Sequence, residues 1–264
     1  MSAVIAVALA VVIGLSGCAT PPKDDPEAME AFIATADPYE PLNRGVFEFN
    51  LALDKAILRP IAYVYKEAVP GTIRNYVRNF MDNLRTPVIL ANDLLQGEFS
   101  RAGGTLIRFV MNSSFGVGGI VDFAGAVGVN GHNEDFGQTM AVWGVGAGPY
   151  LMLPFLGPSS PRQAVGSLVG FLFDPFTYYG ETEWGIGRFA MRAVDNRAVR
   201  YDTIDELERT SLDFYAAVRS LHRQLRADEI HNGVPSAEQP LPMMSFIPVD
   251  TGDELAQPKL SMAD

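Results

Sequence analysis

The sequence predicts an all-α protein built from short amphipathic helices. Through much of the chain, apolar residues recur every three or four positions, which is the period of a helix with one buried face. Few strands are expected, because no pair of alternating apolar and polar runs is joined by an Asn-Gly or Asp-Gly turn. In addition, one long stretch carries almost no charge and is broken repeatedly by glycine and proline, so its helices should be short.

The expected helices lie in one domain that covers residues 37–231. Their ranges are 42–69, 72–84, 88–95, 101–112 and 203–227. Pro60 should kink the first helix, because an interior proline removes a hydrogen-bond donor and crowds the preceding turn. Thr203 and Glu206 have the spacing of a capping box, which predicts the start of the last helix.

The middle of the chain carries far fewer charged residues than the part that follows it. Between Phe109 and Phe173 only four residues are charged, and residues 136–161 carry no charge at all. A single transmembrane helix is not expected there, because glycine and proline interrupt every window of that length and lipid-exposed backbone must satisfy its own hydrogen bonds. We expect short helices that lie in, or just within, a membrane boundary. An unusually apolar soluble core is the alternative.

The N-terminus predicts a lipid anchor. Residues 1–17 contain an uncharged apolar run that is too short to span a bilayer and is typical of a signal peptide. The run ends in Leu-Ser-Gly-Cys, which resembles the lipobox of bacterial lipoproteins, so Cys18 should carry the lipid. No Lys or Arg precedes the run, which a start a few residues upstream would explain. Ala19 follows the cysteine, whereas lipoproteins retained at the inner membrane usually carry Asp there. An outer-membrane location facing the periplasm is therefore expected.

Two further segments flank the predicted domain. Residues 18–36 are expected to form a lipidated tether, and the acidic, proline-rich residues 232–264 are expected to form a disordered tail. The formal net charge of −11 argues against a nucleic-acid partner, because phosphate backbones are bound by basic clusters.

Motifs for catalysis, cofactors or metals are weak. Gly144, Gly146 and Gly148 precede Pro149 and do not follow a clear strand, so a flexible hairpin is expected rather than a nucleotide loop. His132, Glu134 and Asp135 have residue types that bind metals, but a solvated loop is the preferred interpretation. Serine-hydrolase, zinc-protease and P-loop motifs are absent. We therefore expect no catalytic residue, no cofactor and no metal.

Carboxylates stand beside very apolar runs at Asp122 and Asp174. Each could contact a lipid head group or line a polar pore, and helix N-capping is the simpler role. The large phenylalanine and methionine side chains around them suit irregular acyl-chain surfaces, and they suit a protein core equally well.

Many separate motifs, in order, resemble the MlaA (VacJ) family of outer-membrane lipoproteins. The resemblance covers about residues 37–199. It includes Asp-Pro-Tyr-Glu-Pro-Leu-Asn-Arg at 37–44, Leu-Arg-Pro-Ile-Ala at 58–62, Leu-Gln-Gly at 95–97, Gly-Val-Gly-Gly-Ile at 116–120, Asp-Phe-Gly-Gln-Thr at 135–139 and Gly-Val-Gly at 144–146, with Gly-Pro-Tyr at 148–150.

The resemblance implies a ring-shaped, membrane-embedded assembly of helices around an amphipathic channel. Mislocalised glycerophospholipids would leave the outer leaflet through this channel and pass to a periplasmic lipid-binding protein of an inner-membrane ABC transport system. It also implies association with a trimeric porin. In this family pattern, Gly144, Gly146, Gly148 and Pro149 belong to a hairpin that gates the channel, and their alternative role is ordinary turn structure.

Two residues are further candidates for control or lining of the channel. Asn43 lies in the matching N-terminal motif and is a candidate for holding the channel closed, and Asp122 is a candidate for lining it. A structural lipoprotein that scaffolds porins without moving lipid is the main alternative function. A lipid hydrolase is a third class, against which the missing nucleophile motif argues.

Overall fold

The computed structural model describes residues 37–179 and 182–231, and it is mostly helical, as predicted. The elements run in the order α3 (Glu40–Leu53), η1 (Asp54–Leu58), α4 (Arg59–Ala68), α5 (Gly71–Gln96), α6 (Phe99–Ser114), α7 (Phe123–Ala126), α8 (Phe136–Val142), β1 (Leu151–Leu153), β2 (Gly157–Ser159), α9 (Pro161–Phe173), α10 (Phe176–Tyr179), α11 (Thr182–Val199), α12 (Tyr201–Thr210) and α13 (Phe214–Ile230). The predicted signal peptide, Cys18, the tether and the acidic tail lie outside the described residues.

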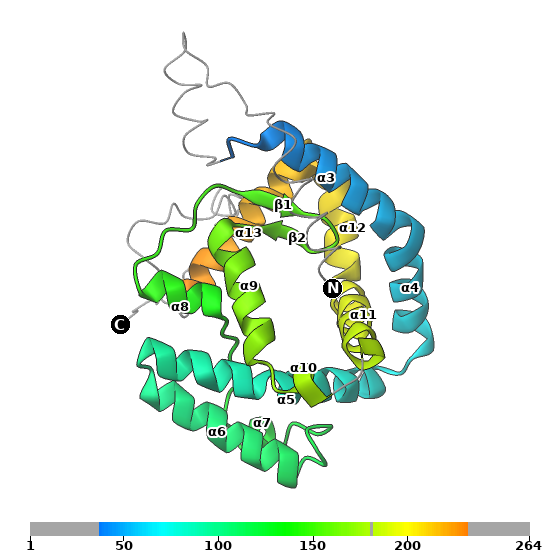
Figure 1. Ribbon diagram of the computed structural model, residues 1–264. Helices are drawn as coiled ribbons and strands as arrows, with labels where there is room; N and C mark the ends of the chain where they lie inside the picture. The colour runs from blue at the N-terminus through cyan, green and yellow to red at the C-terminus, as the bar shows by residue number, and fades with distance from the viewer. Residues whose placement is uncertain (1–36, 180–181, 232–264) are drawn as a thin grey trace, which may run out of the picture.

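The first helical segment contains the disturbance expected at Pro60. Helix α3 passes into the π-helical turn η1, and Pro60 then occupies the first turn of α4. Because Pro60 has no N–H to donate to the preceding turn, the helical hydrogen-bond ladder is interrupted there, and a π-helical turn is one of the usual ways in which a continuous helix accommodates such an interruption. The segment curves along one side of the molecule from α3 to α4 (Figure 1).

Two helices predicted around Pro87 are in fact one. Helix α5 continues through Pro87 from Gly71 to Gln96. An interior proline costs about 3 kcal/mol, and α5 compensates by packing along α6, α8 and α11. The helix ends at Gly97, whose φ of +79° is a left-handed conformation that suits glycine.

The single helix predicted from Thr203 is also incorrect. Helix α12 begins at Tyr201, so Thr203 and Glu206 lie inside it and form no capping box. The chain leaves the helix after Thr210, and a second helix, α13, starts behind Asp213. The Asp213 carboxylate accepts a hydrogen bond from the Ala216 amide at 3.1 Å, and this cap favours a break that the continuous apolar stripe concealed.

A two-stranded hairpin modifies the all-α prediction. Strands β1 and β2 pair antiparallel, with Leu151 opposite Ser159, and their loop contains Pro154, Phe155 and Leu156. This loop is not one of the Asn-Gly or Asp-Gly turns sought in the sequence. The hairpin lies against α3, and a small core of Phe47, Tyr150, Met152 and Tyr215 joins it to α13.

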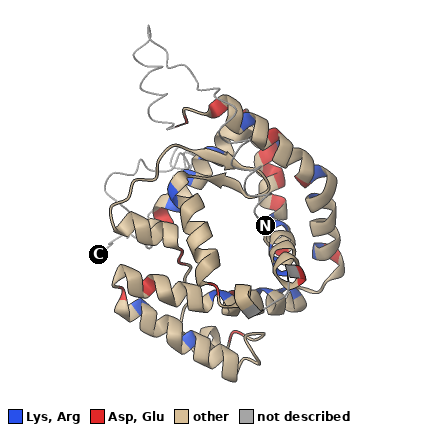
Figure 2. Ribbon diagram, in the orientation of Figure 1, with Lys and Arg blue, Asp and Glu red and all other residues tan. Residues whose placement is uncertain are grey.

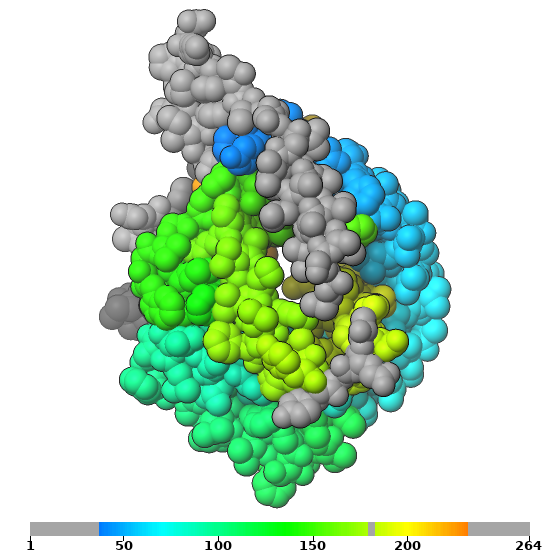
Figure 3. Space-filling model, in the orientation of Figure 1, coloured from blue at the N-terminus to red at the C-terminus, as the bar shows by residue number. Residues whose placement is uncertain are grey.

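The elements follow one another around a central opening, with the β-hairpin and α9 on one side of it and α11 on the other (Figure 1). The space-filling view shows a hollow between these two helices (Figure 3). Charged residues are dense on α3, α4 and the last three helices, whereas α8, the hairpin and α9 carry few (Figure 2). Within residues 37–179 and 182–231, no helix combines the length and apolar character needed to cross a membrane.

Candidate functional site

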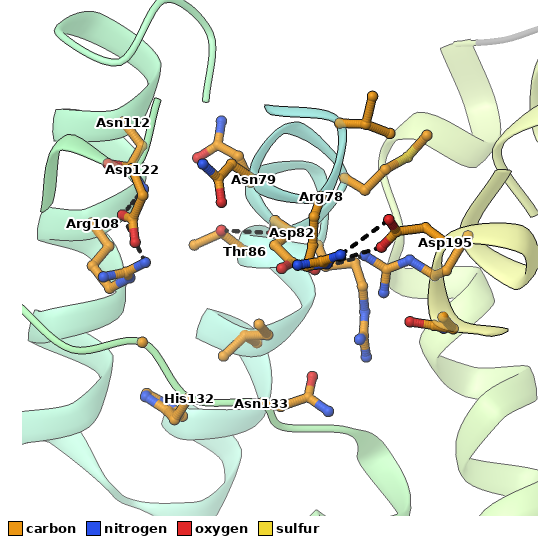
Figure 4. Close-up of a pocket in the computed structure, with 18 of the residues that line it drawn as sticks. Arg78, Asn79, Asp82, Thr86, Arg108, Asn112, Asp122, His132, Asn133 and Asp195 are labelled. Atoms are coloured by element: carbon orange, nitrogen blue, oxygen red, sulfur yellow. Dashed lines mark hydrogen bonds and ion pairs between the residues drawn. The ribbon is translucent and has the colours of Figure 1, made fainter. Parts of the chain in front are cut away.

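A polar cavity of about 560 Å³ lies between α5, α6 and α11. Arg78, Asn79, Asp82 and Thr86 approach it from α5, and Asp195 approaches from α11 (Figure 4). Arg108 and Asn112 of α6 form another wall together with Asp122, His132 and Asn133. Because these groups come from segments that are distant in sequence, only the folded chain assembles them.

Asp122 lines this cavity and also caps a helix. Its carboxylate accepts hydrogen bonds from the Gly125 amide at 3.0 Å, from Asn112 Nδ2 at 2.9 Å and from Arg108 Nη2 at 2.9 Å. Burial alone would raise the pKa of Asp122, but these hydrogen bonds and the nearby Arg108 charge outweigh it and hold the pKa below its usual value. The expected N-capping role of Asp122 is therefore confirmed, and its side chain also faces the polar cavity and is held as an anion.

A second cavity, of about 700 Å³, is mainly apolar. It lies between α3, η1, the β-hairpin and the last helices, and its lining includes Phe47, Ile57, Met152, Phe155, Phe189 and Phe214. Its volume falls in the range of typical small-molecule sites. Asn196 and Arg200 line both cavities. A polar compartment and an apolar compartment therefore adjoin at α11.

Asn43 lines neither cavity and is the centre of a buried polar network. Its Nδ2 donates to Asp37 Oδ1 at 2.7 Å and to the Tyr150 carbonyl at 3.0 Å, and its Oδ1 accepts from the Met152 amide at 2.8 Å. The Tyr215 hydroxyl donates to Asp37 Oδ2 at 2.5 Å, and Arg219 pairs with the same carboxylate at 2.7 Å. Asn43 thus fastens α3 to strand β1, next to the apolar cavity.

The glycine-rich loop connects α8 to the hairpin, and its glycines differ in role. Gly144 has a φ of +85° and forms a Schellman ending with Val145, whose amide bonds to Met140 O at 2.9 Å. Gly148 has a φ of +76°, and a Cβ there would lie 3.0 Å from Pro161 Cγ. Gly146 has no neighbouring atom within 4 Å of its Cβ position.

The loop is fastened by α9, because Arg162 Nη1 donates to the Val145 carbonyl at 2.7 Å. None of Gly144, Gly146, Gly148 and Pro149 lines either cavity. Positive φ values account for Gly144 and Gly148 as turn residues. Gly146 is the glycine of the three for which the surrounding structure gives no steric or backbone requirement.

Three side chains could together hold a metal ion: Asp93, His132 and Glu134, whose ligand atoms lie within 4.8 Å of one another. Each is engaged in protein contacts: His132 Nε2 lies 2.8 Å from Asp93 Oδ1, and Arg101 Nη2 lies 2.6 Å from Glu134 Oε1. Burial is the main cause that raises the pKa of Glu134.

Sequence reasoning missed Asp93. It lies on α5, and its separation from His132 in the sequence matches no short metal-ligand motif. Asp135 belongs elsewhere: it caps α8 and pairs with Arg226 at 2.7 Å. Asp174 also has a structural role, since it accepts from the Phe176 amide at 3.0 Å at the start of α10 and pairs with Arg188.

Comparison with known proteins gives the family. The model of the MlaA lipoprotein family matches residues 35–229. The "Intermembrane phospholipid transport system lipoprotein MlaA" of Escherichia coli (strain K12) is 34% identical over 222 residues, which are 83% of this chain and 87% of that protein. An uncharacterized protein of Rickettsia felis is 37% identical over 193 residues, or 72% of this chain and 77% of that protein.

A solved structure is also similar. It is described as "Structural basis for maintenance of bacterial outer membrane lipid asymmetry" and superposes with a TM-score of 0.67 at 35% identity, covering 74% of this chain and 98% of the other. The sequence motifs, the helical architecture and these relatives agree, and the chain belongs to the MlaA lipoprotein family.

Proposed function

We propose that the protein is a lipid-anchored outer-membrane component of a phospholipid transport system. It removes mislocalised glycerophospholipids from the outer leaflet through an amphipathic channel and passes them to a periplasmic carrier, which maintains lipid asymmetry. The observation that carries this proposal is the pair of adjoining cavities, one polar and one apolar, that meet at Asn196 and Arg200. A glycerophospholipid has the same division into a polar head and apolar chains.

Exposed apolar side chains support a position within the bilayer. Phe99 on α6 is 74% exposed, and Phe115 and Val117 before α7 are each 69% exposed. On α9, Leu168 is 56% exposed and Leu172 is 60% exposed. Large apolar side chains exposed in this way suit contact with a membrane or another protein better than contact with water. Helices lying in the inner leaflet of the outer membrane, around a central channel, would satisfy these surfaces without crossing the bilayer.

The remaining parts of the proposal follow from the family resemblance. Cys18 carries the lipid anchor, and the body faces the periplasm. A trimeric porin binds the protein in the outer membrane, and the periplasmic lipid-binding protein of an inner-membrane ABC transport system receives the lipid. The protein itself breaks no chemical bond and needs no cofactor.

Asn43 and the glycine-rich loop are assigned to control of the channel. The contacts of Asn43 with strand β1 suit a residue that holds one arrangement of the hairpin. Gly146, which has open space around it, suits a loop that changes conformation. The alternative function is a structural lipoprotein that scaffolds porins without transporting lipid.

The proposal is tested by isolating the full chain from outer membranes and identifying copurified lipids and proteins by mass spectrometry. Glycerophospholipid at about one molecule per chain, together with a porin, is expected. A porin without any phospholipid would favour the scaffold. Release of fatty acid from added phospholipid by the purified chain would instead indicate a hydrolase.

A further inference from the structure

The polar cavity contains more positive than negative charge, in a chain whose formal net charge is −11. Its lining includes five arginines and three aspartates: Arg78, Arg85, Arg108, Arg192 and Arg200, with Asp82, Asp122 and Asp195. Local positive charge against an acidic background needs a cause, because like charges gathered in a concave site raise the cost of folding.

Three of the arginines have acidic partners. Arg78 forms two hydrogen bonds to the buried Asp195, at 2.9 and 3.1 Å, and Arg108 pairs with Asp122 at 2.9 Å. Arg192 Nη2 lies 2.9 Å from Asp82 Oδ1. Two cationic side chains remain: within residues 37–179 and 182–231, neither Arg85 nor Arg200 has a side-chain hydrogen bond or ion pair.

Arg85 and Arg192 also repel each other. Desolvation is the main cause that lowers the pKa of Arg192, and the positive charge of Arg85 lowers it further. The side chain of Arg192 is 29% exposed and has one ion pair, whereas a guanidinium has five N–H donors. An anion placed between Arg85 and Arg192 would relieve the repulsion and use donors that are otherwise idle.

The position of Arg200 indicates how a ligand would be oriented in this site. Asn196, in the last turn of α11, and Arg200, just after the end of that helix, line both the polar and the apolar cavity. A ligand with its anionic group beside Arg85 and Arg192 could therefore extend past Arg200 into the apolar compartment. An acyl chain fits that compartment, whose lining is mostly aliphatic and aromatic.

We propose that Arg85, Arg192 and Arg200 bind the phosphate of a glycerophospholipid head group, while at least one acyl chain occupies the adjoining apolar cavity. Guanidinium groups suit this task because their planar N–H donors match phosphate oxygens in pairs. The inference rests on the proposed lipid transport and adds the residues that recognise the head group. Arg78 and Arg108 stay with Asp195 and Asp122 and shape the walls.

The test compares binding of three probes to the purified full chain in one detergent. These are dioleoylphosphatidylglycerol, dioleoylglycerol, which lacks the phosphate, and inorganic phosphate. Each competes with a fluorescent phosphatidylglycerol. The variants are Arg85→Gln, Arg85→Lys and Arg200→Gln. The control is Arg209→Gln, on α12, whose native side chain is 76% exposed and lines neither cavity. Thermal unfolding of each variant checks that the fold is retained.

Loss of one guanidinium should weaken phosphatidylglycerol binding about tenfold, the scale of a charge-assisted hydrogen bond. Dioleoylglycerol binding should stay unchanged, Arg85→Lys should recover part of the loss, and Arg209→Gln should behave as wild type. Millimolar inorganic phosphate should not displace the lipid probe.

Three results separate the alternatives. If wild type binds phosphatidylglycerol and both glutamine variants bind it equally well, the arginine site is wrong while lipid transport stands. If inorganic phosphate binds wild type but not Arg85→Gln, and lipid binding is the same in both, the cavity holds free phosphate and the head-group assignment is overturned. If wild type binds neither lipid, the proposed function itself fails.

Discussion

The side-chain amide of Asn43 forms the hydrogen bonds to Tyr150 and Met152 that a neighbouring strand would otherwise form, although both residues are more than a hundred positions away in the sequence. Its Nδ2 donates to the Tyr150 carbonyl at 3.0 Å, and its Oδ1 accepts from the Met152 amide at 2.8 Å. Asn50, further along α3, forms the same pair of contacts: its Nδ2 donates to the Leu153 carbonyl and its Oδ1 accepts from the Phe155 amide, both at 2.9 Å. The first helix therefore fixes the β-hairpin at two points, beside the apolar cavity.

Asn43→Ala should destabilise the protein by about 3 kcal/mol, because it leaves several buried polar groups without partners. Urea unfolding followed by circular dichroism measures the loss. Asn50→Ala is the matched control: Asn50 makes the same kind of contacts but is only partly buried, so its loss should be about 1 kcal/mol. Equal losses for the two variants would contradict the central position assigned to Asn43.

Gly148→Ala should lower stability by about 1–2 kcal/mol, because alanine at positive φ is strained and its Cβ would crowd Pro161. Gly146→Ala should change stability by less than about 0.5 kcal/mol, since no atom lies near the added methyl group. Thermal unfolding of both variants distinguishes them. A larger effect at Gly146 than at Gly148 would contradict this loop geometry.

Gly146→Asp separates a lipid conduit from a porin scaffold. The Cβ of the new side chain meets no atom within 4 Å, so folding and porin copurification should be retained. If the loop gates lipid passage, outer-leaflet phospholipid should change in cells carrying this variant. If the variant changes both porin binding and outer-leaflet phospholipid, or changes neither of them, the scaffold function is favoured.

Asp213 should give a defined acid dependence of stability. Its hydrogen bond from Arg44 is the main cause that lowers its pKa from 3.8 to about 2. Because the folded pKa is below the unfolded pKa, the stability contributed by this carboxylate is present above about pH 4 and is lost as the pH falls toward 2. The side chain is 42% exposed, so solvent screens the contribution.

Asp213→Asn tests this dependence, because asparagine keeps the capping oxygen without the charge. Wild type should be more stable than the variant at pH 6, and the difference should shrink between pH 4 and pH 2. Added salt should reduce the difference at pH 6 as well. No difference at pH 6, or a difference that does not vary with pH, would contradict a contribution from the Asp213 charge.

Local patterns in the sequence were sufficient for the helical class and for several turns, but not for breaks decided by tertiary contacts. At Pro87 the proline rule failed, because packing along α5 offsets a local cost. Around Ser211 the apolar stripe continued through a break that is capped by Asp213 and held by its pairing with Arg44. The spacing of apolar residues shows which face of a helix is buried. It does not reveal a break after which the next helix continues the same apolar spacing.

The site could be predicted only in part. Asp122 was identified because a lone carboxylate beside apolar residues is visible in the sequence. Arg85 and Arg192 are more than a hundred positions apart, and nothing in either local segment distinguishes them from ordinary helix-surface residues. Their relationship arises when α5 and α11 meet at the polar cavity.

The most direct test of the account is the amount of phospholipid in the outer leaflet of intact cells, measured with a membrane-impermeant reagent for phospholipid head groups. Deletion of the gene should raise this amount, and the wild-type chain should restore it. Cys18→Ala should fail to restore it fully, because the anchor would be lost. An outer leaflet that is unchanged after deletion would contradict the proposed transport.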